Sequence, residues 1–211
     1  MIEWRLVTKI PNSKLDGNWQ RSGVKDHVRT EAHERCVYCG IFENYIGGRN
    51  AFHKDHYRPK SKFPELENTL SNIYYACPIC NIFKSNAWPN EPVDDHGSAA
   101  FPDPALIEYG TMFESNQSKG LIEGSYVESR YIQNVLHLNR PQLIMTRREY
   151  YLNRRVEELN RRLLELTPPL LKVGSADAKS LLVSYLAANS QLSNLMKKGE
   201  SIPRYEVGDM K

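Results

Sequence analysis

The four cysteines of this chain fall in two CxxC pairs, CVYC at 36–39 and CPIC at 77–80. Each CxxC turn brings two thiols to one point, and two such turns supply the four ligands of a closed tetrahedral zinc shell. Two disulfides are a minor alternative, because a chain without a signal peptide is expected where thiols stay reduced. We therefore predict that a structural zinc ion staples residues 40–76 into one module. Its ligands are Cys36, Cys39, Cys77 and Cys80.

The composition is that of a globular protein with a weak overall charge. At 211 residues, of which 40% are hydrophobic, the chain fits one core plus a smaller unit. A net charge of +3 permits a polyanionic partner without requiring one. The N-terminus carries scattered charges, and no run approaches the roughly 18 apolar residues of a membrane span. We expect a soluble, cytoplasmic protein that does not associate with membranes.

The segment between the cysteine pairs has the pattern of strand, loop, strand and helix. A Gly-Gly-Arg-Asn turn precedes an expected strand at 52–56, and Pro59 and Pro64 then enforce a loop. A second strand is expected at 72–76, directly before the second cysteine pair. From Asn81 onward the sequence can form a helix.

This order of motifs resembles the HNH nucleases. An Asp-His ends the first strand, an Asn precedes the second, and CPICN is followed by a Lys three residues later. Within that family, the phrases DHYRPKSKFPEL and CPICNIFK are similar to the HNH subunits of Septu and retron-associated anti-phage systems. The resemblance covers about a quarter of the chain. It implies an α+β fold in which a zinc-stapled ββα-metal module precedes a mainly α-helical C-terminal region.

The same resemblance implies an endonuclease that hydrolyses phosphodiester bonds in DNA, leaves a 3′-hydroxyl and a 5′-phosphate, and is the effector of an anti-phage defence system. Such hydrolysis uses a hard divalent cation, Mg²⁺ or Mn²⁺, with oxygen ligands and open positions. The resemblance assigns those ligands to the carboxylate of Asp55 and the amide oxygen of Asn81. His56, with an ordinary pKa of about 6.5, is the candidate general base. His53 shares a strand face with Asp55; it could join the metal site, but we favour a core histidine.

Other polar residues of the motif receive supporting roles. In HNH proteins an Asn at the position of Asn72 ties the loop between the strands, so we favour that catalytic-site role over a surface turn. Lys84 lies about one helical turn after the candidate metal ligand on the helix, and we expect it to reach a phosphate. Arg58 and Lys60 are further candidates for DNA binding, whereas we interpret Lys62 as a solvated loop residue.

Residues after the second cysteine pair are expected to change from loop to helix. A proline-rich stretch and a small hairpin around NQSKG occupy 89–125, and helical periodicity follows. We predict a nuclease module at 1–88, a linker with a hairpin at 89–125, and a helical region at 126–211 that docks a partner or DNA. Besides the helix from Asn81, the expected helices are 22–35, 126–138, 142–166 and 176–197, of which the third is stopped by Thr167-Pro-Pro.

Arginines recur every seven residues along the long helix, at Arg147, Arg154 and Arg161. The same helix has a leucine seam, formed by Leu152, Val156, Leu159, Leu163 and Leu166. At about 100° per residue the arginines would lie nearly opposite this seam and form an exposed ridge. Glu157 and Glu158 lie three or four residues from Arg154 and Arg161, so a solvated face laced with salt bridges is the favoured interpretation. A surface that binds DNA or a partner is the sharper alternative.

The sequence contains no GxxxxGK[ST] phosphate loop, so any dependence on nucleotide would come from another chain. The similarity to Septu-type subunits implies an ATPase partner of the ABC/SMC type. Two other classes of function stay open: a non-catalytic zinc ribbon that binds nucleic acid or protein, and a purely structural subunit of a larger complex.

Overall fold

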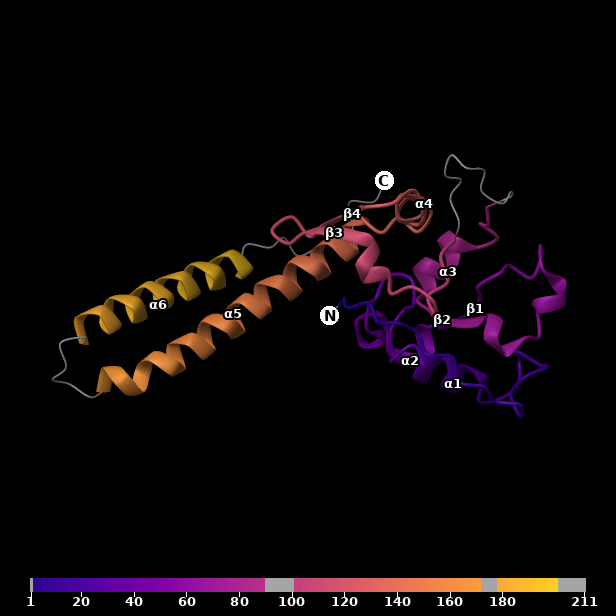
Figure 1. Cartoon of the computed structure of the whole chain (residues 1–211), viewed down its shortest axis with the longest axis horizontal. Coiled ribbons are helices and arrows are strands. Elements are labelled where there is room, and N and C mark those ends of the chain that lie inside the picture. The colour runs from indigo at the N-terminus through magenta and orange to yellow at the C-terminus, as the bar shows by residue number, and fades with distance from the viewer. Residues whose placement is uncertain (1, 90–100, 172–177, 201–211) are drawn as a thin grey trace. The chain divides into compact units, whose positions relative to one another are not determined.

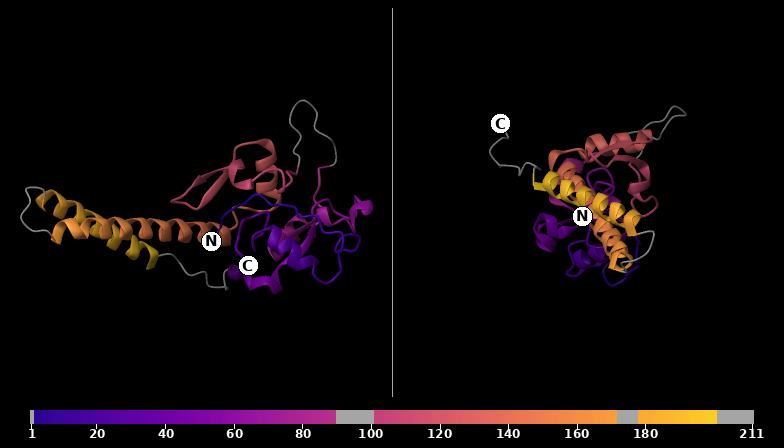
Figure 2. Two further views of the ribbon diagram at one scale, coloured as in Figure 1. Left: turned by 60° about the horizontal axis from the view of Figure 1, so that its bottom comes forward. Right: turned by 90° about the vertical axis from the view of Figure 1, so that its left-hand side faces the viewer.

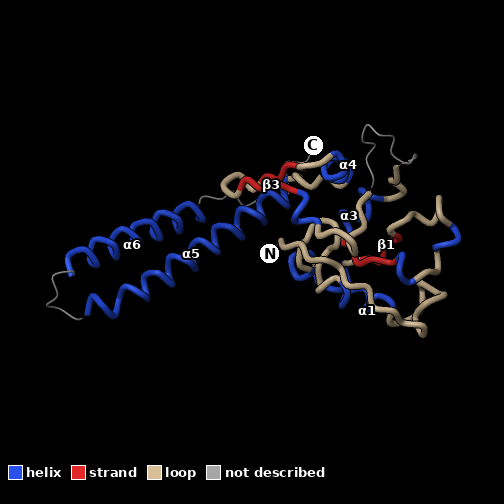
Figure 3. Tube along the Cα trace, viewed as in Figure 1, coloured by secondary structure: helices blue, strands red, loops and turns tan. Residues whose placement is uncertain are grey.

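The computed structural model describes residues 2–89, 101–171 and 178–200 (Figure 1). The chain divides into two compact units, residues 1–147 and 148–211, and each is described by itself. Among the described residues, strands are confined to two short hairpins of the first unit, and the rest is helix and loop (Figure 3). The expected α+β class is therefore confirmed.

The first hairpin forms the centre of the first unit. β1 (His53–His56) pairs antiparallel with β2 (Ile73–Ala76), so that His56 lies opposite Ile73. All four residues of β2 are buried, and α1 (Val24–Glu31) contacts both strands and buries its Val24 and Val28. The two strands expected from the sequence are both present.

The helix that follows β2 starts earlier than expected. α3 (Pro78–Lys84) begins directly after Cys77 rather than at Asn81. Proline suits the first helical position because its missing N–H has no partner there in any helix. The Sγ of Cys77 then caps the helix by accepting a hydrogen bond from the N–H of Cys80 at 3.4 Å. The thiol spacing that favours zinc thus also defines this helix start.

The N-terminal segment packs onto this module. Ile2 forms a β-bridge with Ile41, and the indole N–H of Trp4 donates to the carbonyl of Tyr38 at 3.0 Å. This segment therefore covers the first cysteine turn.

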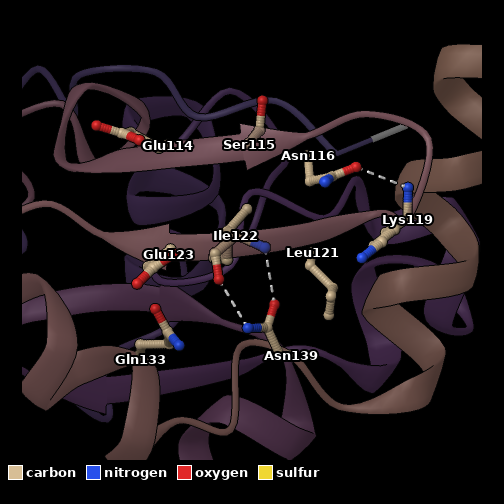
Figure 4. Close-up of a pocket in the computed structure, with 9 residues that line it drawn as sticks. All are labelled: Glu114, Ser115, Asn116, Lys119, Leu121, Ile122, Glu123, Gln133 and Asn139. Atoms are coloured by element: carbon tan, nitrogen blue, oxygen red, sulfur yellow. Dashed lines mark hydrogen bonds between the residues drawn. The ribbon is translucent and has the colours of Figure 1, made fainter.

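The second hairpin belongs to the same unit. β3 (Phe113–Asn116) pairs with β4 (Leu121–Gly124), as the turn NQSKG predicts, and α4 (Val127–Val135) follows. The side chain of Asn139 holds β4 by bonding both the N–H and the carbonyl of Ile122, at 3.0 and 2.7 Å (Figure 4). The shorter helical segments of the unit are η1 (Glu43–Ile46), α2 (Gly48–Ala51), η2 (Pro64–Leu66), η3 (Leu70–Asn72) and η4 (Tyr109–Met112).

The second unit is a pair of helices. α5 (Pro141–Leu171) enters it at Arg148 and runs beside α6 (Ala178–Glu200) in both Figure 1 and Figure 2. Leu159 of the expected leucine seam is buried, and so is Ala188 of α6. None of the described helices has the length and apolarity needed to cross a bilayer.

The long helix does not stop where the sequence suggested. It continues through Thr167-Pro-Pro to Leu171, so the expected end is wrong. A proline keeps a helical φ angle and costs a hydrogen bond and a local clash, which raises the free energy of a helix without excluding it. The side chain of Leu166, the last residue of the expected leucine seam, lies outside the described part of the structure.

Candidate functional site

The zinc-ligand prediction concerns four side chains that the fold brings together. The first cysteine turn and the start of α3 place their sulfur atoms within 4.8 Å of one another, and all four residues are buried. None of them forms a disulfide, and the Sγ atoms of Cys39 and Cys77 are 3.8 Å apart. Four converging thiols without a carboxylate or water position fit a structural zinc ion. The four are Cys36, Cys39, Cys77 and Cys80.

Asp55 is a buried carboxylate with two donors on one oxygen. It lies in β1 and is 6% exposed. Its Oδ2 accepts a hydrogen bond from the Tyr38 hydroxyl at 2.5 Å and lies 2.9 Å from the Nζ of Lys84. Burial raises the pKa of Asp55, while the charge of Lys84 and the hydrogen bond from Tyr38 act in the opposite direction. Tyr38, inside the first CxxC turn, is a site residue that the sequence interpretation missed.

Lys84 does not lie where we expected. Its side chain has no exposed surface, and its Nζ donates to the carbonyl of His56 at 2.7 Å in addition to its ion pair with Asp55. Burial lowers the pKa of Lys84, and the neighbouring carboxylate opposes that shift. The helical spacing was correct, but the side chain turns inward. Instead of reaching a phosphate in solvent, Lys84 joins the end of α3 to the end of β1.

The side chain of His56 is held by a backbone carbonyl. Its Nε2 lies 2.9 Å from the carbonyl oxygen of Glu67, and the ring packs against the edge of Trp19 with 5.0 Å between centroids. Because a carbonyl only accepts hydrogen bonds, Nε2 carries the proton in the neutral ring and Nδ1 keeps its lone pair. Burial lowers the pKa of His56, which favours this neutral form at neutral pH. The geometry leaves Nδ1 as the basic atom.

Asn72 bonds the loop between the strands with both ends of its amide. Its Oδ1 accepts from the N–H of Arg58 at 2.9 Å, and its Nδ2 donates to the carbonyls of Arg58 and Leu66 at 3.0 and 3.3 Å. These bonds join two distant points of the loop to the start of β2. They are the contacts that an orienting role for Asn72 would need; that role stays a prediction.

The remaining histidine and amide of the motif differ in exposure. Asn81, the candidate amide ligand, is half-buried on α3 directly after Cys80. His53 is exposed, so the favoured interpretation as a core histidine is wrong. It is the first residue of β1 and pairs with Ala76. In the described structure this sheet has two strands, so no further strand pairs with β1 on its other edge.

The basic residues of the loop are exposed and lie beside aromatic rings. The guanidinium of Arg58 lies 5.6 Å from the ring centre of Phe63. Lys60 pairs with Glu67 at 3.1 Å, and its Nζ is 5.4 Å from the ring centre of Trp19. These side chains are open to solvent, as a contact with a nucleic-acid backbone requires.

The arginine ridge is not formed as expected. Arg147 is only 2% exposed, because its guanidinium donates to the carbonyls of Gly120 and Leu138 at 3.0 and 2.5 Å. It belongs to the first unit, whereas Arg154 and Arg161 belong to the second and are exposed. A seven-residue repeat specifies one helix face, but here the β3–β4 hairpin covers the first turn of that face.

A pocket lies at the second hairpin. It has a volume of about 610 Å³, and Figure 4 shows polar side chains from β3, β4 and α4 around it. It contains none of the predicted catalytic or metal-binding residues, so we do not assign the candidate chemistry to it.

Comparison with known proteins agrees with the position of the site. A family described as HNH endonuclease matches residues 36–87, from the first cysteine of the zinc cluster to just beyond α3. No curated protein and no solved structure matches the chain. The match supports an HNH nuclease domain at these residues, for which DNA is the implied substrate.

Proposed function

We propose that this protein is a metal-dependent HNH endonuclease that hydrolyses phosphodiester bonds in DNA. The observation that carries the proposal is the arrangement of three side chains within the matched segment. Asp55 and His56 end β1, and Asn81 follows the zinc-cluster residue Cys80 on α3, which contacts β1. A carboxylate, an imidazole and an amide on neighbouring elements supply the group types that one-metal hydrolysis needs.

The oxygen donors fit a hard divalent cation, Mg²⁺ or Mn²⁺, in their chemistry. Asp55 would offer Oδ1, since Oδ2 already accepts two hydrogens, and Asn81 would offer its amide oxygen. Such an ion neutralises charge on the phosphate and helps the leaving oxygen depart. Because Lys84 cancels the charge of Asp55, we expect the ion to bind weakly until a DNA phosphate adds its own negative charge.

The chain's own contribution is to hold and move a proton. The Nδ1 atom of His56 accepts the proton of the attacking water, while the carbonyl of Glu67 fixes the ring through Nε2. Asn72 holds the neighbouring part of the loop, because its Nδ2 donates to the carbonyl of Leu66, the residue before Glu67. Arg58 and Lys60 hold the DNA backbone beside the imidazole.

The test is cleavage of supercoiled plasmid with Mg²⁺ or Mn²⁺ by the wild type and its His56→Ala variant. We expect the cleavage rate to fall by a factor of roughly 10² or more, with zinc content and fold retained. His53→Ala is the matched control, because His53 is an exposed histidine of the same strand and should be removable without loss. Equal cleavage by His56→Ala and wild type would contradict the proposal.

One observation favours a second candidate, a zinc-stapled module that binds nucleic acid or protein without cutting. The pairing of Asp55 with Lys84 leaves the candidate ligand without net charge, which disfavours a resident divalent cation. In this case the purified protein would shift DNA in a gel but would not cut it, whichever divalent metal is added. The plasmid assay therefore separates the two functions.

We further propose, from the similarity to Septu and retron-associated subunits, that the protein is a defence effector controlled by an ATPase of the ABC/SMC type. The second unit offers a surface for that partner. Leu182, Val183 and Leu186 are exposed apolar residues of α6, and Arg154 and Arg161 are exposed on α5.

The double variant Arg154→Glu/Arg161→Glu tests the charged part of this surface. We expect it to weaken assembly with a co-expressed ATPase subunit, or DNA binding, more at low salt than at moderate salt. The alternative is that these arginines belong to a solvated helix face, which agrees with the ion pair of 2.7 Å between Arg161 and Glu165. Wild-type assembly and DNA binding at both salt concentrations would assign the two arginines to that solvated face.

A further inference from the structure

One cation contacts the cysteine cluster from outside the segment that matches the HNH family. Arg140 directly precedes α5, far along the chain from the second cysteine pair. Its Nη2 lies 3.5 Å from the Sγ of Cys80 and 3.9 Å from the Sγ of Cys77. Its Nη1 donates to the carbonyl of Leu136 at 2.9 Å, which fixes the guanidinium at the end of α4.

The surroundings of Arg140 show which charge it balances. Among the described residues no carboxylate pairs with it, and its buried Nε has no hydrogen-bond partner there. Arg140 is half-buried, and taking its charge partly out of water costs less where negative charge lies beside it; here the sulfur atoms of Cys77 and Cys80 are the groups that can supply it.

The cluster in turn needs such a cation. Four thiolates around one Zn²⁺ carry a net charge of −2, and a buried site with that charge is costly unless donors from its surroundings hydrogen-bond the sulfur atoms. The N–H of Cys80 supplies one such bond to Cys77, and Arg140 adds two contacts together with a full positive charge.

We propose that Arg140 is the charge partner of the zinc–thiolate cluster, so that zinc retention by the HNH-matching segment depends on a residue between α4 and α5. Arg140 is a positioning residue: it acts on the zinc through Cys77 and Cys80 and touches no reacting group. The inference rests on the zinc assignment and is independent of nuclease activity.

The experiment measures zinc transfer from the full-length, zinc-loaded protein to a chromogenic chelator. Arg140→Met keeps much of the side-chain length and removes charge and donors, whereas Arg140→Lys keeps the charge. We expect transfer to be about tenfold faster or more for Arg140→Met, with Arg140→Lys between it and the wild type. Alkylation of the cysteines by iodoacetamide should accelerate in the same order, because the cation shields the thiolates.

The matched control is Arg130→Met, since Arg130 donates to a backbone carbonyl, that of Gly124 at 3.3 Å, and bonds no sulfur in the described part of the chain. It should leave zinc transfer unchanged. A folded Arg140→Met protein with the wild-type transfer rate would overturn the proposal. If Arg140→Met unfolds, Arg140→Lys decides: it should release zinc faster than the wild type, because an ammonium keeps the charge but not the forked contact with both sulfur atoms, and release at the wild-type rate refutes the inference.

Discussion

Replacing Lys84 with methionine separates the role that its position in the sequence suggests from the role that its contacts suggest. A lysine that binds a DNA phosphate contributes to affinity and little to folding. A lysine that bonds Asp55 and the carbonyl of His56 inside the protein contributes mainly to the free energy of unfolding. The structure gives Lys84 the second set of contacts, with 0% of its side chain exposed and 7% of that of Asp55.

The expected loss follows from what the substitution leaves behind. Methionine fits the space of the lysine stem, but Asp55 becomes a buried carboxylate whose remaining donor is the Tyr38 hydroxyl. Removing one partner of a buried ion pair typically costs about 3–5 kcal/mol. The hydrogen bond from Tyr38 and partial protonation of Asp55 reduce that cost, so we expect a loss of about 3 kcal/mol in the free energy of unfolding.

The assay is urea unfolding of zinc-saturated protein, arranged as a double-mutant cycle. Asp55→Asn alone leaves a buried ammonium without a counter-charge and should also destabilise the protein. In the double variant Asp55→Asn/Lys84→Met both charges are gone, so the loss should be smaller than the sum of the single losses by about 2 kcal/mol. DNA affinity of folded Lys84→Met, measured in parallel, should stay close to that of the wild type.

The opposite pattern would refute this reasoning. If the free energy of unfolding of Lys84→Met lies within about 0.5 kcal/mol of the wild-type value, the ion pair does not stabilise the site. If DNA affinity falls at the same time and its salt dependence weakens by about one phosphate contact, Lys84 reaches the substrate as its sequence position suggests.

Two further predictions concern the zinc site and the packing of α1. Cys80→Ser should lower zinc stoichiometry and destabilise the module, because zinc-binding energy is folding energy there, whereas Asp55→Ala should keep its zinc; zinc retained by Cys80→Ser in elemental analysis would contradict the assignment. Burial would raise the pKa of Glu43, but hydrogen bonds from Arg29 and Tyr75 lower it overall. The ionised Glu43 therefore contributes to the free energy of unfolding at pH values above its unfolded-state pKa of about 4.3, and this contribution is lost as the pH falls through the lower folded-state pKa. The unfolding free energies of wild type and Glu43→Gln should therefore differ by a constant amount from about pH 5 to pH 8 and converge only below that range; a difference that changes within it would count against this ion pair.

The features that the sequence predicted well are those with a short, local cause. CxxC spacing fixes two thiols on one turn, and Pro59 and Pro64 fix a loop between the two strands. Helix α3 was placed three residues late because Cys77 was considered only as a ligand, although the same sulfur also caps the helix.

The features that the sequence did not predict depend on distant partners. The spacing of Lys84 and Arg147 gives the helix face on which each lies, but whether that face is covered depends on β1 in one case and the β3–β4 hairpin in the other. Trp19 and Arg140 belong to no motif and reach the site only through the tertiary fold. A single arginine in a loop cannot be assigned to a site from the sequence, because only the tertiary fold shows which anionic groups lie beside it.

These distant contacts act on the two ends of one short helix. At its start, Arg140 contacts the sulfur atoms of Cys77 and Cys80, and at its end Lys84 bonds Asp55 and the carbonyl of His56. Asn81 lies between these two fixed points, and a helix of seven residues has too few hydrogen bonds of its own to keep that position if either end is released. His56 is also held by the carbonyl of Glu67, a contact that does not involve α3. Loosening either end of α3 should therefore affect the amide ligand before it affects the imidazole base, and a cleavage defect from such a change should respond to added Mn²⁺ more than the defect of His56→Ala does.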